Sequence, residues 1–311
     1  MRDLMRAIVT GGAGFIGSHI VRQLISDGNE VIVIDDLSTG SLARLRGLEG
    51  VKFIKGRSSL IKNMPAADVV FHEGAPSSTP LYRNDRTNVA RVVEDFINVA
   101  EYCVKNNAKL VFASSSSIYN GHPPKHREDM LPKVTDFYTE VKYLMERLAD
   151  LYSQMHGLEY VALRYFSVYG DGEEAKKHFA NMVSQAIWKI VLDKEIVIYG
   201  DGSQRRDFTY VDDIVSANML AYEKDVSGVF NVGTGISYSF NEMLGVLKEV
   251  TGREAKVRYV PNPLKNYVNV VEADTKKSES VLGFVPKVKF EEGVGKTFEY
   301  YSKLGFVPDL P

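Results

Sequence analysis

The segment that decides the fold is Ala7-Ile-Val-Thr-Gly-Gly-Ala-Gly-Phe-Ile-Gly-Ser-His19. Its apolar start is typical of a buried strand, and its glycines follow with the spacing G-x-x-G-x-x-G before apolar residues recur at helical spacing. A strand, a glycine turn and a helix in this order predict a dinucleotide site, because the turn lets backbone N–H groups reach a pyrophosphate at the helix N-terminus. A glycine-rich turn without a ligand is the alternative. We expect this site to be formed by Gly11, Gly14, Phe15, Ile16 and Gly17.

A second apolar run, Glu30-Val-Ile-Val-Ile-Asp-Asp36, ends in two carboxylates. Asp35 follows Gly17 by 18 residues, close to the spacing of ~20 typical of the acid that binds the adenosine ribose. A carboxylate at this place repels a 2′-phosphate, so the sequence favours NAD over NADP. We expect Asp35 and Asp36 to lie in the site, and the alternative is a solvated strand end.

Composition excludes several classes of function. The 311 residues are 44% hydrophobic and 25% charged, which is typical of a globular protein with two domains or one large domain. The net charge of −2 gives no basic field for nucleic acid. One cysteine and the absence of paired histidines predict no disulfide and no metal site. Without an apolar run of membrane length or a signal peptide, we expect a cytoplasmic protein that does not bind membranes.

Strand and helix patterns alternate through the first half of the chain, which predicts a doubly wound α/β fold with a parallel sheet. Ligands of such sheets bind at the carboxyl ends of the strands, so we expect the loop Gly74-Ala75-Pro76 to contact the cofactor. Strands are predicted near 6–10, 30–35, 51–55, 68–72, 108–113 and 158–165, and helices near 15–27, 88–106 and 138–156. A smaller C-terminal α/β lobe is predicted from helices near 178–192, 240–251 and 291–303.

Tyr138 and Lys142 open a predicted helix that follows the serine-rich run 113–119. Residues four apart on a helix project from one face. A lysine cation favours the phenolate, so we expect Lys142, with the positive nicotinamide nearby, to lower the pKa of Tyr138 from its ordinary value of ~10 and make it a general base. A serine from the strand end could bond the same substrate oxygen. A chance Tyr/Lys pair on a helix surface is the alternative.

The predicted helix 88–106 has a wide apolar face. Deep burial and contact with a second subunit explain this width equally well. The second explanation predicts a homodimer.

The motifs taken together resemble the extended short-chain dehydrogenase/reductase family, in particular its nucleotide-sugar epimerase and dehydratase branch, over nearly the whole chain. They are TGGAGFIGSH (10–19), VIVIDDLSTG (31–40), FASSSSIYNG (112–121), YTEVK (138–142), RYFSVYG (164–170), IYGDGSQRRDFTYVDDIV (198–215), NVGTG (231–235) and ADTKKSESVLGFVP (273–286).

The resemblance implies NAD as cofactor and a nucleotide sugar as substrate. Ser115, Tyr138 and Lys142 fall at the family's catalytic positions, and Lys142 also at the position that holds the nicotinamide ribose. Further cofactor contacts are implied for Ser38, Gly40 and Tyr165, and substrate contacts for Ser115, Ser167, His178, Phe179, Val197, Tyr199 and Arg206. We expect an NAD-binding domain over residues 1–169, to which 206–235 returns, and a substrate-binding lobe made of 170–205 and 236–311.

The residues after Ser115 bear on the reaction. The family's 4,6-dehydratases carry an Asp-Glu pair there and its decarboxylating members a glutamate, whereas this chain has Ser116 and Ser117. This leaves oxidation and re-reduction, which is all that a 4-epimerase acting on UDP-glucose or UDP-galactose requires. The alternatives are a nucleotide-sugar reductase, an epimerase at another carbon, and a non-catalytic NAD-binding sensor.

The chain departs from the family pattern at four places. Arg57 stands where an aspartate near the adenine is usual, so that it could stack on the adenine or be exposed, and Glu73 stands where an apolar residue is usual. Ser167 replaces an asparagine, and Leu264 and Lys265 stand where a second diphosphate-binding arginine is expected.

Overall fold

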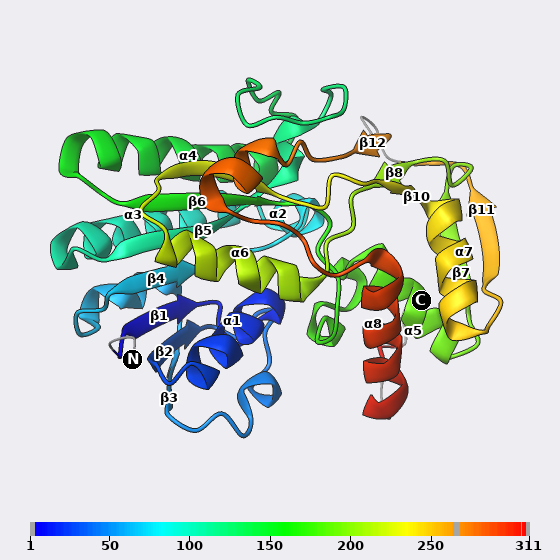
Figure 1. The fold of residues 1–311 in the computed structure, drawn as a ribbon, viewed down its shortest axis with the longest axis horizontal. Helices are drawn as coiled ribbons and strands as arrows, with labels where there is room; N and C mark the ends of the chain where they lie inside the picture. Colours follow the sequence, from blue (N-terminus) through cyan, green and yellow to red (C-terminus); the bar gives the residue numbers. More distant parts are fainter. Residues whose placement is uncertain (1–3, 264–267, 306, 309–311) are drawn as a thin grey trace.

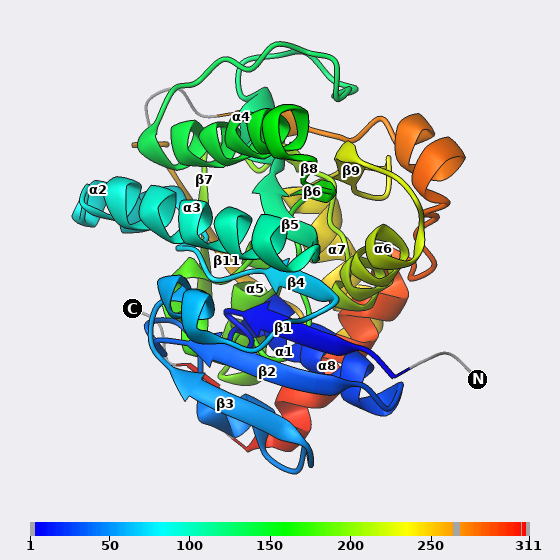
Figure 2. The ribbon, with the colours of Figure 1, turned by 90° about the vertical axis from the view of Figure 1, so that its left-hand side faces the viewer.

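The computed structural model describes residues 4–263, 268–305 and 307–308. Its main element is a seven-stranded parallel sheet in the order β3-β2-β1-β4-β5-β6-β9. Figure 2 shows β3, β2, β1, β4 and β5 side by side in this order. The chain winds outward from β1 to β3 and then returns to β4, which confirms the predicted doubly wound fold. The strands are β1 (Arg6–Thr10), β2 (Glu30–Asp35), β3 (Val51–Lys55), β4 (Val69–His72), β5 (Lys109–Ser115), β6 (Tyr160–Tyr165) and β9 (Gly228–Val232).

Helices cover both faces of this sheet. Successive strand residues point to opposite sides, and since most of them are apolar, both faces must be covered. Val9 and Val33 face one apolar core, which includes residues of α1 (Phe15–Ser26) and α6 (Val211–Glu223). Ile8 and Ile32 face the other core, which includes residues of α2 (Thr79–Asn84), α3 (Asn88–Asn106) and α4 (Phe137–His156). Burial on both faces explains why the strands are almost entirely apolar rather than alternating.

A smaller lobe with its own apolar core lies beside the sheet, to its right in Figure 1. It contains a parallel pair and a short three-stranded sheet. Its elements are β7 (Glu195–Tyr199), β11 (Lys256–Val260), β8 (Arg205–Arg206), β10 (Tyr238–Ser239), β12 (Val270–Val271), α5 (Met182–Val191), α7 (Phe240–Thr251) and α8 (Phe290–Leu304). The short helical turns among the described residues are η1 (Leu42–Leu45), η2 (Ser58–Asn63), η3 (Ser116–Tyr119), η4 (Glu174–Phe179) and η5 (Ser278–Leu282).

The predicted helix near 178–192 starts later than expected. Lys177 has φ 50° and ψ −125°, which interrupts the helical backbone within η4. The side-chain oxygen of Asn181 then accepts a hydrogen bond from the backbone N–H of Val183 at 3.0 Å and begins α5 at Met182.

Candidate active site

Two adjoining cavities lie at the carboxyl edge of the sheet, and they share Gly11, Gly14, Thr39, Glu73 and Ala75. The larger has a volume of about 680 Å³ and opens between the two lobes. Its lining includes these predicted residues: Gly11, Gly14, Phe15, Ile16, Gly17, Ala75, Ser115, Tyr138, Lys142, Tyr165, Ser167, Phe179 and Arg206. The smaller cavity, of about 440 Å³, is lined by Gly11 and Gly14 and by these others: Asp35, Asp36, Ser38, Gly40, Gly74, Ala75 and Pro76.

The glycine turn fits a dinucleotide diphosphate. A Cβ atom on Gly17 would lie 2.2 Å from the carbonyl oxygen of Gly11, so only glycine allows the turn and the helix to pack this closely. Helix α1 begins at Phe15 without a side-chain cap from Gly14 and without an acidic residue in its first turn. Its N–H groups and its positive dipole end therefore suit an anion in the larger cavity.

Asp35 links the glycine turn to the end of β2. Its side chain is 6% exposed and accepts hydrogen bonds from the backbone N–H groups of Leu37 at 2.7 Å and Ala13 at 2.9 Å. Burial raises the pKa of Asp35, and the bonds from Leu37 and Ala13 oppose that shift. The carboxylate thus lines the smaller cavity, in the place expected for the acid that binds a ribose.

The guanidinium of Arg57 is bound to residues of α3. Its guanidinium donates hydrogen bonds to Glu94 at 2.8 Å and to the carbonyl oxygen of Arg91 at 3.0 Å, and it lies 3.1 Å from Asp95. Asp95 also accepts a hydrogen bond from the backbone N–H of Ser59 at 3.0 Å. Arg57 is therefore tied to α3, and both Arg57 and Asp95 line the smaller cavity.

The pair Tyr138 and Lys142 lies on the cavity side of α4. Asp136 caps this helix by accepting a hydrogen bond from the N–H of Thr139 at 3.0 Å, which sets the register of the first turn. The Nζ of Lys142 donates a hydrogen bond to the carbonyl oxygen of Ala113 at 2.6 Å. Tyr138, Lys142 and Ser115 all line the larger cavity, although they come from two different elements.

Burial, rather than Lys142, decides the pKa of Tyr138. Burial raises this pKa to about 12, and a hydrogen bond with Ser115 opposes the shift. The expected lowering, which also depends on the nicotinamide charge, does not hold for the protein alone, because desolvation of the phenolate outweighs the stabilisation by its neighbours. Burial also lowers the pKa of Lys142 to about 8, against the opposing effect of Glu73 and Glu146.

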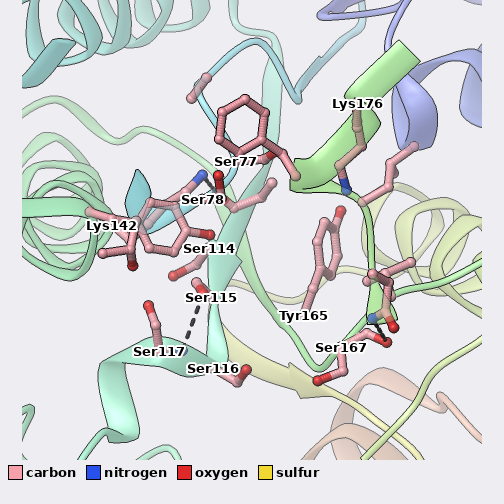
Figure 3. Close-up of a pocket in the computed structure, with 18 of the residues that line it drawn as sticks. Ser77, Ser78, Ser114, Ser115, Ser116, Ser117, Lys142, Tyr165, Ser167 and Lys176 are labelled. Carbon is pink, nitrogen blue, oxygen red and sulfur yellow. Dashed lines mark hydrogen bonds between the residues drawn. The ribbon is translucent and has the colours of Figure 1, made fainter. Parts of the chain in front are cut away.

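Serines at the end of β5 form one wall of the larger cavity. The Oγ of Ser115 accepts a hydrogen bond from the N–H of Ser117 at 3.1 Å. Figure 3 shows Lys142 and the serines at 114–117 on one side of the cavity, and Tyr165, Ser167 and Lys176 on the other. Within the described part of the chain, the buried hydroxyls of Ser78 and Ser117 have no hydrogen-bond partner. Both residues line the larger cavity.

Glu73 lies where the two cavities meet. Its carboxylate accepts a hydrogen bond from the hydroxyl of Tyr165 at 2.8 Å, and this hydroxyl accepts one from the side chain of Asn218 at 2.8 Å. Burial raises the pKa of Glu73 to about 7, opposed by Tyr165 and by Lys142. The sequence marked Glu73 as unusual but did not place it among the site residues.

Three of the predicted substrate contacts are not among the lining residues: His178, Val197 and Tyr199. In β7 the residues Ile196 and Ile198 point into the core of the smaller lobe, so Val197 and Tyr199 point outward and are exposed. Leu264 and Lys265, where the second arginine was expected, lie outside the described residues.

The larger cavity also has lining residues that the sequence did not single out: Ser77, Ser78, Thr79, Arg83, Asn120, Asp136, Lys176 and Asn181. The first three directly follow the predicted loop Gly74-Ala75-Pro76, so their position after a strand end was a usable signal. No sequence pattern placed Asn181 at the cavity, and only the tertiary fold brings it there. Its Nδ2 donates a hydrogen bond to the carbonyl oxygen of Ser167 at 2.9 Å.

The helices built from the described residues are all too short or too polar to cross a bilayer. Among those same residues, no group of three or more His, Cys, Asp or Glu side chains could hold a metal ion.

Comparison with known proteins agrees with this geometry. The profile of the NAD dependent epimerase/dehydratase family matches residues 7–233. The "Putative UDP-glucose 4-epimerase" of Methanocaldococcus jannaschii is 33% identical, over 94% of this chain and 97% of its own length. UDP-glucuronic acid decarboxylase 1 of Arabidopsis thaliana is 32% identical, over 94% of this chain and 69% of its own length.

Among solved structures, UDP-glucose 4-epimerase from Thermotoga maritima with UDP-glucose aligns with a TM-score of 0.89. It shares 32% identity, over 97% of this chain and 100% of that one. The extent of these matches and the parallel sheet with its glycine turn lead to the same conclusion: the chain belongs to the NAD-dependent epimerase/dehydratase family.

Proposed function

We propose that this protein is an NAD-dependent nucleotide-sugar 4-epimerase that acts on a UDP-hexose of the UDP-glucose/UDP-galactose type. The observation that carries the proposal is the lining of the larger cavity. Ser115, Tyr138 and Lys142 line it together with the glycine turn, while the next two positions, 116 and 117, are serines. This arrangement supports oxidation of a carbinol and supplies no carboxylate at those two positions.

Each of these residues has a role in the proposed reaction. NAD, when bound, supplies the hydride acceptor and donor. Tyr138 takes the proton of the sugar C4 hydroxyl and returns it when the 4-keto sugar has turned over, and Ser115 holds the same oxygen by a hydrogen bond. Lys142 supplies a positive charge that favours the phenolate form of Tyr138 in the closed site.

The far end of the cavity suits the substrate's diphosphate. Arg206 lies on β8, where its guanidinium donates a hydrogen bond to the carbonyl oxygen of Arg205 at 2.8 Å. Lys176 lines the same cavity and pairs with Glu173 at 2.8 Å. A guanidinium carries five N–H donors in a planar fork that matches phosphate oxygens, and Arg206 lines the cavity, so we assign the diphosphate to Arg206.

Decarboxylation and dehydration are less well supported. Their carboxylates in the resembling enzymes stand at positions that are Ser116 and Ser117 here, and both serines line the cavity. A hydroxyl group does not exchange protons near neutral pH as a carboxylate does. This chain therefore lacks the acidic groups of the decarboxylase branch at these two positions, although a relative named as a decarboxylase is 32% identical to it.

The test is to incubate the purified protein with UDP-glucose, UDP-galactose, their N-acetyl forms and UDP-glucuronate, and to follow the sugars by NMR. We expect a mixture of C4 epimers with no net change in NAD or NADH. Net consumption of reduced cofactor would instead indicate a reductase, and release of carbon dioxide from UDP-glucuronate a decarboxylase. If no substrate is converted while NAD remains bound, the sensor alternative is favoured.

We also propose that the protein is a homodimer. Apolar side chains are exposed on α3, at Ile97, and on α4, at Leu151 and Met155. These two helices pack side by side on the same face of the sheet, so together they offer one apolar surface to a second copy. Sedimentation at micromolar concentration should give the mass of a dimer, and a monomer would refute the proposal.

A further inference from the structure

We propose that the carboxylate of Glu73 makes the site prefer the oxidised dinucleotide over the reduced one. The inference rests on the proposed function, because that function places the nicotinamide ring in the larger cavity beside Tyr138. It assigns to Glu73 an electrostatic role that neither Tyr138 nor Lys142 fills.

The position of Glu73 is fixed from several sides. Its backbone closes against the glycine turn, since a Cβ atom on Gly11 would lie only 2.7 Å from the carbonyl carbon of Glu73. Its side chain is held by the hydroxyl of Tyr165 at 2.8 Å, and Tyr165 is held in turn by Asn218 on α6. The carboxylate therefore cannot swing out to solvent without breaking this chain of hydrogen bonds.

Two neighbouring side chains act directly on the charge of Glu73, although the cavity lining also includes Arg83, Asp136 and Lys176. From α4 it faces the ammonium of Lys142, and from β6 it faces the neutral phenol of Tyr165. At the end of β4, directly before Glu73, His72 is buried, and its Nδ1 lies 2.7 Å from the hydroxyl of Thr10. Burial lowers the pKa of His72 to about 3, so that this ring is neutral. Glu73 and Lys142 thus set the local charge.

The ring of the oxidised dinucleotide carries a positive charge that the reduced ring lacks. A half-buried carboxylate in the same cavity stabilises the charged form, and charges several Å apart in such a site change an equilibrium constant by about tenfold or more. The ammonium of Lys142 acts in the opposite direction. Glu73 therefore offsets an unfavourable charge that the catalytic lysine would otherwise impose on the oxidised cofactor.

The test measures binding rather than turnover. Purified protein is equilibrated with mixtures of NAD and NADH, free nucleotide is removed, and the bound forms are quantified after denaturation. Glu73→Gln keeps the size of the side chain and the acceptor for Tyr165 but removes the charge. We expect the preference for NAD over NADH to fall about tenfold or more in this variant.

Two control variants separate charge from structure. Tyr165→Phe removes the hydrogen bond but leaves the carboxylate, and Glu73→Asp keeps the charge, so both should retain most of the preference for NAD. If Glu73→Gln binds the two forms in the same ratio as the unaltered protein, the proposal is wrong. A loss of preference in Tyr165→Phe equal to that in Glu73→Gln would also contradict it, because the hydrogen bond would then be the cause.

The pH dependence gives a second, independent readout. Since burial raises the pKa of Glu73 to about 7, the carboxyl loses its proton between roughly pH 6 and 8. The preference for NAD should therefore increase with pH over this range, and more steeply in the unaltered protein than in Glu73→Gln, where only Lys142, with a pKa of about 8, still loses its charge. Identical profiles in the two proteins would overturn the proposal. Epimerisation of UDP-hexoses is assayed separately, so failure of either proposal leaves the other open to its own test.

Discussion

Replacing Gly17 by alanine tests the glycine turn most directly. The added Cβ atom would lie 2.2 Å from the carbonyl oxygen of Gly11, 2.8 Å from its carbonyl carbon and 2.9 Å from the Cα of Gly12. Real Cβ atoms essentially never approach other heavy atoms more closely than 3.0 Å. All three neighbours are backbone atoms, so the clash can be relieved only by moving α1 away from the turn.

The size of the effect follows from this geometry. Overpacking of a closely packed site costs about 1–3 kcal/mol, and the better helix propensity of alanine returns up to ~1 kcal/mol. We therefore expect Gly17→Ala to lower the free energy of unfolding by about 1–2 kcal/mol. The displaced helix N-terminus should also lose about one charge-assisted hydrogen bond to the diphosphate, which corresponds to a loss of roughly tenfold to a hundredfold in NAD affinity.

The assay combines NAD titration calorimetry with urea unfolding. Gly245→Ala is a matched control, because Gly245 also lies within a helix, α7, but its added Cβ atom would meet no atom within 4 Å. The control should leave NAD affinity unchanged and increase stability by up to ~1 kcal/mol. If Gly17→Ala binds NAD within twofold of the unaltered protein and unfolds at the same urea concentration, our account of the turn is refuted.

Three further outcomes are expected. Tyr138→Phe should reduce the rate of the proposed UDP-hexose epimerisation by about 10²–10⁴-fold with little change in NAD affinity. Initial rates and NAD titration measure these two quantities. A variant with the normal rate would show that Tyr138 is not the base. Arg164→Met should destabilise the protein by about 3–5 kcal/mol in urea unfolding, because it leaves Glu146 as an unpaired buried charge. The side chain of Glu146 is 4% exposed and lies 2.7 Å from the guanidinium. A loss of stability below ~1 kcal/mol would contradict this prediction. Burial lowers the pKa of His72 to about 3, so its contribution to stability should be complete above its unfolded pKa of about 6.5 and should fall by up to ~1.4 kcal/mol per pH unit below that value. Urea unfolding at several pH values should show a shallower decrease in stability for His72→Gln. Identical slopes in the two proteins would refute the assignment.

The sequence alone determined the fold and the position of the cofactor edge. The glycine spacing from Gly11 to Gly17, followed by an acid at Asp35, predicted a first strand, a turn, a helix and a second strand, and the structure has each of them. The four-residue spacing of Tyr138 and Lys142 placed both on one face of a helix. These predictions succeed because they depend on distances along the chain, which the helix and strand repeats convert directly into positions in space.

Only the tertiary structure decided the charges inside the site. The bond between Glu73 and Tyr165 joins residues 92 positions apart, and Arg57 is bound by acids of α3 that no local pattern connects to it. The pKa of Tyr138 was expected to fall, whereas burial raises it to about 12. Proximity between distant residues and the cost of removing a charge from water depend on how whole elements pack, and that packing is not encoded in the spacing of any one segment.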